Sequence, residues 1–373
     1  MENRNSNPNE TLRQLKGMAE DPSPNVRERA AEALEEAGKI YPVEALELIE
    51  RLIGDSDIHV QDRAAGALKA IGRSRPDESL ELMERLAKDQ SSYIREKAAE
   101  VLIEIGRSGP KKALGVLEKL IEDPSSHVRE RAVMTLIDIE RSNPGEALDT
   151  IQKLIEDPSS HVRERVAGAL IVIGKSNPKK ALGVLEKLIE DPSFHVRREA
   201  AEVLEEIGGS SPIETLEMLE KLVGDPNKAV QEKALSALLN IGRSNPNETL
   251  KWLERFLGDP SSEVRKKALD LLEEIGNSNP RSALELVEKG MGDPNAIVRK
   301  KAFEVLDKIR ESNLKETSRW IKRMLGDPSP NVRERAAEAL IEIGRSRPDE
   351  SLELMERLAK DQSSYIREKA AEV

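Results

Sequence analysis

The chain has 373 residues, of which 35% are charged and 2% are aromatic, and its formal net charge is -11. This composition excludes a large core built on Phe, Tyr and Trp, so Leu, Ile, Val and Ala must supply the buried surface. The sequence has no cysteine, which excludes disulfides, thiolate metal sites and cysteine nucleophiles. The first residues, MENRNSNPNE, lack an apolar run, and no window reaches the about 18 apolar residues of a membrane span. The sequence therefore predicts a cytoplasmic protein that does not enter a membrane.

The chain begins with a polar stretch, residues 1–7, which we interpret as a tail. The apolar spacing then predicts a first helix from Pro8 to about Ala19. After this helix an Asp recurs every 34 residues without insertion or deletion, at Asp21, Asp55, Asp89, Asp123, Asp157, Asp191, Asp225, Asp259, Asp293, Asp327 and Asp361. A period this strict indicates a repeat array, in which no unit buries its apolar faces without its neighbours.

Each period, numbered from its Asp as position 1, carries two apolar stripes with helical spacing. The first stripe occupies positions 6, 10, 14 and 17, and the second occupies positions 26, 29, 32 and 33. We expect the Gly at position 18 to end the first helix and the Pro at position 22 to start the second. In the unit that begins at Asp157, this Asp is the expected N-cap, Pro158 lies in the first turn, and Val162, Val166 and Leu170 face the core.

The period resembles HEAT and HEAT-like repeats of the PBS-lyase type. The resemblance is carried by an Asp, an Arg six positions later and the Ala, Leu and Ile-Gly stripe, as in DPSSEVRKKALDLLEEIG at 259–276. It implies an all-α, right-handed α-solenoid of about eleven two-helix repeats, which forms one domain over residues 8–373. It also implies that the helices carrying the Arg line the concave side.

In that family the Asp and the Arg form a hydrogen-bonded ladder between successive repeats. The resemblance places this ladder on Asp89 with Arg95, Asp123 with Arg129, Asp157 with Arg163 and Asp191 with Arg197, and likewise on Asp21 with Arg27, Asp259 with Arg265, Asp293 with Arg299, Asp327 with Arg333 and Asp361 with Arg367. A planar guanidinium can bridge a carboxylate and nearby carbonyls in a fixed geometry. Gln61 and Gln231 replace the Arg, so we expect a weaker ladder there.

The end of the sequence differs from a regular repeat. The last unit stops at Val373, about four residues short of its siblings, and lacks the polar cap with which solenoids normally end. We therefore expect a truncated last repeat, whose uncapped end is compatible with end-to-end self-association. Residues 71–101 are identical to residues 343–373, which indicates recent copying or design.

The four histidines are the first candidates for chemistry, and all occupy position 5: His59, His127, His161 and His195. Packed helices lie roughly 8 to 10 Å apart, whereas a zinc–nitrogen bond is about 2 Å, so one ion could not readily bridge neighbouring units. We interpret these histidines as surface residues. The sequence shows no nucleophile elbow, phosphate loop or metalloprotease helix, so we expect no catalytic residue, no metal and no cofactor.

Two other features stand out on the second helices. Trp252 and Trp320 both fall at position 28, where we expect them to pack on the outer helix. Residues 298–323 hold nine Lys or Arg against four acids, and this unit has Arg310 and Leu314 in place of the usual Gly and Pro. We interpret this unit as an irregular joint with a solvated face; the alternative is a docking site.

Positions 8, 12 and 15 lie farthest from the buried stripe, so we expect them on the concave wall. Acids dominate positions 12 and 16 and predict an acidic groove, with Glu100, Glu104, Asp138, Glu202 and Glu206 among its residues. An apolar strip lies in its middle, formed by Ile103, Met134, Ile137, Ile171 and Val172. Exposed aliphatic residues that adjoin one another usually mark a contact site. The alternative is that position 15 is half-buried against the next inner helix.

These features predict a non-catalytic scaffold that binds a protein or peptide partner in the groove. The partner would be basic and amphipathic. Nucleic acid is not expected because the concave face is acidic. The HEAT-like fold also resembles that of alkylated-DNA glycosylases and bilin lyase subunits, which would make the chain an enzyme or a subunit of one. A third interpretation is a designed or consensus-like array without a natural partner.

Overall fold

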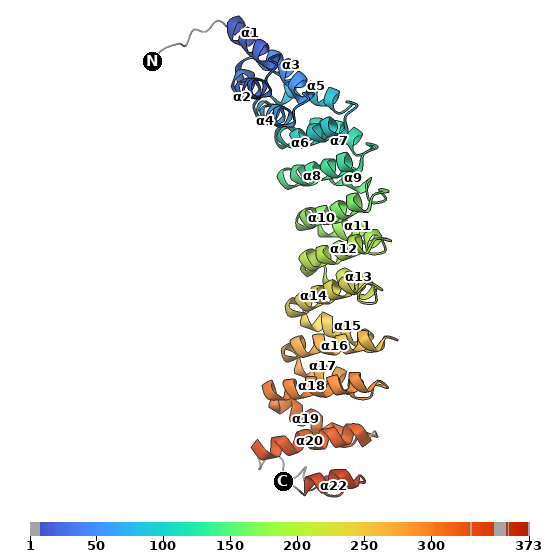
Figure 1. Cartoon of the computed structure of the whole chain (residues 1–373). Coiled ribbons are helices and arrows are strands. Elements are labelled where there is room, and N and C mark those ends of the chain that lie inside the picture. The colour runs from blue at the N-terminus through green and yellow to red at the C-terminus, as the bar shows by residue number, and fades with distance from the viewer. Residues whose placement is uncertain (1–7, 329, 347–355, 357, 372–373) are drawn as a thin grey trace, which may run out of the picture. The chain divides into compact units, whose positions relative to one another are not determined.

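A computed structural model describes residues 8–328, 330–346, 356 and 358–371 of the chain (Figure 1). The predicted tail, residues 1–7, and much of the second copy of the repeated segment lie outside the described residues. The chain divides into two compact units, Met1–Ala200 and Ala201–Val373, and the division falls inside helix α12. In both units, all regular structure in the described part of the chain is helical.

The helices are of two kinds that alternate along the chain. The odd-numbered helices correspond to the second helix of each period and are α1 (Pro8–Ala19), α3 (Pro42–Ile53), α5 (Pro76–Leu86), α7 (Pro110–Leu120), α9 (Leu148–Gln152), α11 (Pro178–Leu188), α13 (Pro212–Val223), α15 (Pro246–Phe256), α17 (Pro280–Met291) and α19 (Leu314–Met324). The even-numbered helices carry the ladder position and are α2 (Pro24–Ile40), α4 (Ile58–Ser74), α6 (Ser92–Ser108), α8 (Ser126–Ser142), α10 (Ser160–Ser176), α12 (Phe194–Ile207), α14 (Lys228–Ser244), α16 (Ser262–Ile275), α18 (Ala296–Ser312), α20 (Pro330–Ser346) and α22 (Ser364–Ala370). Two short 3-10 helices, η1 (Gly208–Ser210) and η2 (Gly276–Ser278), continue α12 and α16.

Helices of the same kind pack side by side in each unit. In the first unit α2, α4, α6, α8 and α10 form one row, and α1, α3, α5 and α7 form part of the other. In the second unit α14, α16 and α18 form one row, and α13, α15, α17 and α19 form the other. Each unit is thus a two-layered stack of helix pairs. This confirms the predicted all-α solenoid of 34-residue repeats.

The predicted apolar stripe forms the core between the two layers. In α10 the side chains of Val162, Val166 and Leu170 are fully buried, as the 3.6-residue spacing predicts. Burial of each such aliphatic side chain stabilises the fold by about 1.5 to 3 kcal/mol. One helix pair lacks the partners to bury both faces, so the stacking of neighbours supplies most of this stabilisation.

The repeated Asp has a different local role from the one predicted. Helix α10 begins at Ser160 with Ser159 as N-cap, so Asp157 lies two residues before the cap and Pro158 lies outside the helix. Asp157 Oδ1 instead accepts a hydrogen bond of 2.8 Å from the backbone N–H of Ser159. The N-cap prediction is therefore wrong. An Asp in this turn holds its own backbone and still presents its carboxylate to the preceding repeat.

The Gly at position 18 also has a different role from the one predicted. Helix α6 runs through Gly106 and ends at Ser108, so this Gly does not stop the helix. A Cβ on Gly106 would lie 2.5 Å from the Ile139 side chain of the next repeat. The Gly therefore makes room for Ile139. Only where the α-helix does end early, as α16 does at Ile275, does the Gly follow it directly.

One odd-numbered helix is shorter than the pattern predicts. The period places its start at Pro144, but α9 covers only Leu148–Gln152. Glu140 occupies the usual Gly position and is buried, and its carboxylate accepts hydrogen bonds from the backbone N–H groups of Gly145 and Ala147. Gly145 has a φ of 91°, in the left-handed region that favours glycine. These bonds hold the segment before α9 in a turn.

The basic unit at residues 298–323 is more regular than we expected from its sequence. Helix α18 has 17 residues and α19 has 11, the same lengths as α14 and α15, so the predicted irregular joint is wrong in its helix lengths. The two tryptophans, Trp252 and Trp320, are buried, which confirms that they pack on the odd-numbered helices.

Candidate functional site

The ladder consists of guanidinium groups that join successive even-numbered helices. Arg129 Nε and Nη2 donate to the two carboxylate oxygens of Asp157 in the next repeat, at 2.6 and 2.8 Å. Its Nη1 donates to the backbone oxygen of Asp123 in its own repeat, at 2.6 Å. The carboxylate bond therefore crosses to the following repeat, and the Asp of the same repeat contributes its carbonyl. Each such rung is bidentate and charge-assisted.

The same geometry recurs in both units. Further complete rungs join Arg27 to Asp55, Arg95 to Asp123, Arg163 to Asp191 and Arg265 to Asp293. The backbone oxygens of Asp89 and Asp191 accept from Arg95 and Arg197 within their own repeats, at 2.7 and 2.6 Å.

The rungs are ion pairs at neutral pH. The hydrogen bond from Arg27 holds the pKa of Asp55 below its usual value despite partial burial. Burial raises the pKa of Asp123, but the hydrogen bonds from Arg95 and from the backbone of Ser125 outweigh this effect and lower the pKa. These carboxylates therefore stay ionised and paired within the stack.

Two rungs are incomplete because glutamine replaces arginine. Gln231 Nε2 donates to the backbone oxygen of Asp225 at 2.6 Å, so the bond within the repeat is kept. The carboxylate of Asp259 accepts from the backbone of Ser261 at 2.7 Å, but a glutamine cannot give it the bidentate ion pair. Gln61 bonds to Asp55 in the same way. Helices α14 and α16 pack less closely than α16 and α18, whose rung is complete.

Besides the rungs, a lysine at position 9 also joins neighbouring even-numbered helices. Lys301 of α18 forms ion pairs with Asp270, at 2.9 Å, and Glu273 of α16. Burial lowers the pKa of Lys301, but the hydrogen bonds that its ammonium donates to these two carboxylates, with their negative charges, outweigh it and raise the pKa well above its usual value. Lys233 pairs in the same way with Glu202 and Glu205, at 3.5 and 3.0 Å. We call this contact the lysine clamp.

The lysine clamp is missing between α14 and α16. The equivalent lysine is Lys267, but Ser236 and Leu239 of α14 stand where the two acids would be. The Lys267 ammonium lies 3.4 Å from the side-chain oxygen of Gln231 instead. Both the complete rung and the lysine clamp are therefore lost at the same place.

A groove of about 860 Å³ lies where these two contacts are missing, and we call it the α14–α16 groove. Its apolar residues are Leu235 and Leu239 on α14, both half-buried, and the buried Leu271 on α16. Charges of both signs surround them: Lys228, Glu232, Glu263, Lys266, Asp270 and Glu274. This groove was not predicted from the sequence, although Gln231, together with Ser236 and Leu239 in place of acids, indicates it.

The apolar strip predicted in the first unit is only partly brought together. Ile137, Ile171 and Val172 are half-buried and line a smaller groove of about 420 Å³ on α8 and α10. Met134 is 38% exposed and Ile103 is half-buried, and neither lines this groove. The complete rung from Arg129 to Asp157 joins the same two repeats, and this groove has about half the volume of the α14–α16 groove.

Glu104 does not belong to an open groove. It is 4% exposed, and Arg73 of the preceding repeat donates two hydrogen bonds to its carboxylate, at 2.9 and 3.2 Å. The hydrogen bonds from Arg73 lower the pKa of Glu104 against the effect of burial. The pattern of a single repeat does not reveal this burial, because the Arg that pairs with position 16 comes from the preceding repeat.

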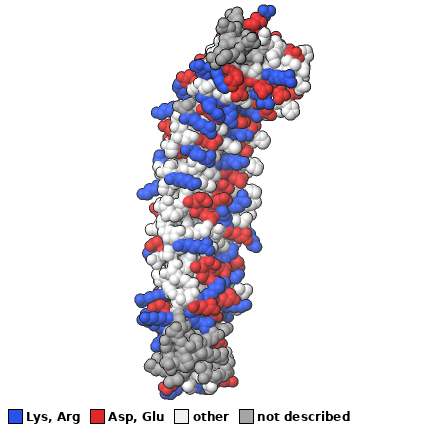
Figure 2. Space-filling view, turned by 90° about the vertical axis from the view of Figure 1, so that its left-hand side faces the viewer, with Lys and Arg blue, Asp and Glu red and all other residues white. Residues whose placement is uncertain are grey.

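Most of the acids predicted to line the groove have basic partners, and the acidic character of the groove stays a prediction. Among the acids expected there, Glu206 is exposed, but Glu100 pairs with Lys97, Asp138 with Arg141 and Glu202 with Lys233. Position 9 is Lys or Arg in almost every repeat, so bases alternate with the acids. On the face that Figure 2 shows, blue and red side chains are interleaved, and no single acidic surface appears.

In the part of the chain that the structure describes, no group of three or more His, Cys, Asp or Glu is placed to hold a metal ion. The side chains of His59, His127, His161 and His195 are exposed. Of the described helices, none combines the length and the apolar character needed to cross a membrane.

The stacked helix pairs and the Asp–Arg rungs define an α-solenoid repeat protein. The family model for HEAT repeats matches the chain over residues 9–103, 80–145, 115–175, 167–223, 215–307 and 284–373. The chain therefore belongs to the HEAT-repeat family. A search of curated proteins found no match.

Two solved structures of Kap121p show the same fold at low sequence identity. The karyopherin Kap121p bound to Pho4p is 15% identical, with a TM-score of 0.58, and the match covers 97% of this chain and 45% of that one. Kap121p bound to the extreme C-terminus of the protein phosphatase Cdc14p is 14% identical, with a TM-score of 0.59 and the same coverage. An engineered protein matches 90% of this chain at 23% identity, with a TM-score of 0.42. The chain thus spans less than half the length of Kap121p.

Proposed function

We propose that the chain is a non-catalytic scaffold that binds a protein or peptide partner on its even-numbered helices. The observation that carries this proposal is the α14–α16 groove, where the loss of a rung and of a lysine clamp leaves Leu235 and Leu239 accessible. Partly exposed aliphatic residues that adjoin one another on a surface mark contact sites. The complexes of Kap121p with Pho4p and with the C-terminus of Cdc14p support a binding role for this fold.

The partner in this proposal is amphipathic, with aliphatic residues that occupy the groove. An amphipathic helix presents such residues at i, i+3 or i+4 and i+7, which suits a groove between two parallel rows of side chains. This groove does not favour a basic partner, because its rim carries Lys228 and Lys266 as well as Glu232 and Glu263. Opposite charges on the two sides of the groove would set the partner's orientation.

The smaller groove at Ile137 and Ile171 is a second contact in the same proposal. Its rim is also mixed in charge, with Glu130 and Glu164 beside Arg165. A cytoplasmic location and self-association through the end of the chain stay predictions. An enzymatic role and an array without a partner stay the alternatives to this proposal.

A selection from a displayed peptide library tests the proposal. We expect the intact chain to enrich peptides with aliphatic residues at helical spacing. Substitution Leu239→Glu places a charge in the groove at a half-buried position and should weaken binding of these peptides at least about tenfold. The matched substitution Ile137→Glu, in the other groove, separates the two contacts. Circular dichroism melts of both variants check the fold.

Each result bears on the proposal. Loss of binding in the Leu239→Glu variant alone supports the α14–α16 groove, and loss in the Ile137→Glu variant alone moves the site to the first unit. Peptides that bind both folded variants as tightly as the original chain would refute a role for either groove.

A further inference from the structure

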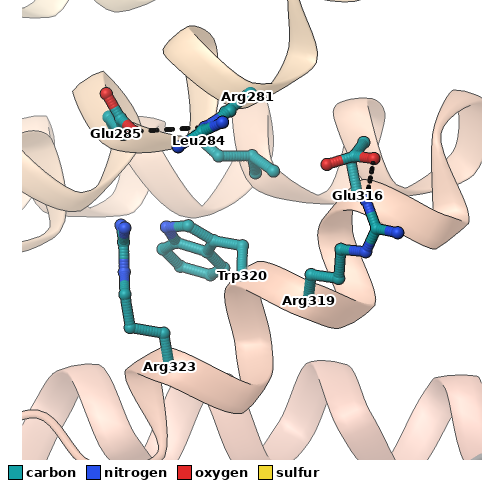
Figure 3. Close-up of a pocket in the computed structure, with 7 residues that line it drawn as sticks. All are labelled: Arg281, Leu284, Glu285, Glu316, Arg319, Trp320 and Arg323. Carbon is teal, nitrogen blue, oxygen red and sulfur yellow. Dashed lines mark hydrogen bonds and ion pairs between the residues drawn. The ribbon is translucent and has the colours of Figure 1, made fainter.

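The odd-numbered helices of the second unit carry a separate pocket. It has a volume of about 240 Å³ and lies between α17 and α19 (Figure 3). Its lining residues are Arg281, Leu284 and Glu285 from α17, and Glu316, Arg319, Trp320 and Arg323 from α19. Three guanidinium groups and an indole therefore surround one small space. The scaffold function on the even-numbered helices makes no use of it.

Trp320 gives this pocket a hydrogen-bond donor that has no acceptor. The residue is 5% exposed, and its Nε1–H has no hydrogen-bond partner among the described residues. Figure 3 shows the indole nitrogen facing the space between the guanidinium groups of Arg281 and Arg323. A buried donor without an acceptor destabilises a fold, so such groups are rare unless something outside the chain completes them.

The arginines around the indole differ in how firmly they are held. Arg319 is paired with Glu316 at 2.7 Å, and Arg323 with Glu288 at 2.7 Å. The ion pair of Arg281 with Glu285 is 3.9 Å long, and the Arg281 side chain is 84% exposed. Arg281 can therefore contact an added acceptor without giving up a short bond. Arg323 is 54% exposed at its side chain, so it can turn aside and uncover the indole N–H.

Trp252, the other tryptophan, has different neighbours from Trp320. Trp252 occupies the same position of its repeat and is also buried, and the Arg255 guanidinium lies over its ring at 4.3 Å. The preceding odd-numbered helix, however, has Ile213 where the pocket has Arg281. Trp252 therefore lacks the cation from the neighbouring helix, and it is not among the buried donors without a partner.

We propose that this pocket binds an oxyanion, a carboxylate or a phosphate group. The anion would accept hydrogen bonds from Trp320 Nε1–H and from the guanidinium of Arg281, with Arg323 beside it. The three lining arginines exceed the two lining glutamates, on a chain whose net charge is -11. An anion would thus supply the acceptor that the indole lacks and would add to the contacts of the least firmly held arginine.

The experiment uses the two indole N–H signals of the ¹⁵N-labelled full-length chain. With two tryptophans in the sequence, Trp320→Phe assigns both signals, and Trp252 serves as an internal reference. Inorganic phosphate and acetate are titrated separately at constant pH and ionic strength, with chloride as the comparison anion. We expect the Trp320 signal to shift and saturate while the Trp252 signal stays in place. Saturation with phosphate alone or with acetate alone identifies which oxyanion the pocket takes.

Two matched variants complete the test. Arg281→Gln should weaken the apparent affinity at least about tenfold, because a charge-assisted donor is lost. Arg255→Gln, beside the other tryptophan, should leave the affinity unchanged. The proposal is overturned if neither oxyanion shifts the Trp320 signal, if chloride shifts it equally, or if Arg281→Gln leaves the affinity unchanged. These signals report on the pocket whether or not the α14–α16 groove binds a partner.

Discussion

Helix α16 has two neighbours in its row and meets them in different ways. On the α18 side, Arg265 reaches Asp293 and Lys301 reaches Asp270 and Glu273. On the α14 side neither contact forms, and a groove of about 860 Å³ with leucines in it takes their place. The repeat and its apolar stripe are the same on both sides. A few polar positions therefore decide whether adjacent repeats close against each other or leave a binding surface.

We expect the largest loss of stability when the rung between α16 and α18 is removed. Arg265→Gln copies the natural state of Gln231 and leaves the buried Asp293 carboxylate without its ion pair. We expect the free energy of unfolding to fall by about 2 to 4 kcal/mol, measured by chemical denaturation. Arg243→Gln is the control, because its pair with Glu274 is exposed at both ends and should contribute under about 1 kcal/mol. Equal losses in both variants would mean that the rung adds nothing beyond a surface ion pair.

The lysine clamp should contribute less than the rung. Lys301→Met removes the cation that Asp270 and Glu273 share, and we expect a loss of about 1 to 2 kcal/mol. The same substitution at Lys267, which has no such acid pair, should cost close to nothing. Thermal melts of the two variants measure the difference. If Lys267→Met destabilises the chain as much as Lys301→Met, the clamp does not explain why the two sides differ.

A low pH should remove the stabilisation that the rung between Arg265 and Asp293 gives to the fold. Burial raises the pKa of Asp293, but the hydrogen bonds from Arg265 and from the backbone of Asn295, with the charges of Arg265 and Arg299, together outweigh it, so the folded-state pKa lies below its usual value. The stabilisation is then complete above the unfolded pKa of about 3.9 and is lost as the pH falls through the lower folded pKa. The stability advantage of the original chain over Arg265→Gln should therefore shrink between about pH 5 and pH 2. An advantage that stays constant over this range would exclude an ionic rung.

Much of the fold could be predicted from the sequence because it depends on periodic burial. The Asp spacing and the stripe that contains Val162 and Leu170 follow from helix geometry alone, and the structure confirms them. Gly106 was misread as a helix stop because the residue that needs its space, Ile139, lies a full repeat away. Contacts between repeats cannot be seen in the pattern of one repeat.

The candidate sites were harder to predict for the same reason. Glu104 was expected to be free because its partner, Arg73, belongs to another helix. Leu239 was not predicted as a site residue, because its role depends on the next repeat. It occupies the position where an acid would pair with Lys267. The unsatisfied N–H of Trp320 appears only when all groups around it are placed. Each of these features depends on which side chains meet across two repeats.

The most direct test of the account is the substitution Gln231→Arg, studied with the peptides selected on the original chain. The new guanidinium should form a rung with Asp259, raise the free energy of unfolding by about 1 kcal/mol and weaken peptide binding at least about tenfold by closing the groove. Gln61→Arg, which completes the rung between α4 and α6, should stabilise the chain and leave binding unchanged. A Gln231→Arg variant that gains stability and still binds the peptides as tightly as before would contradict the account.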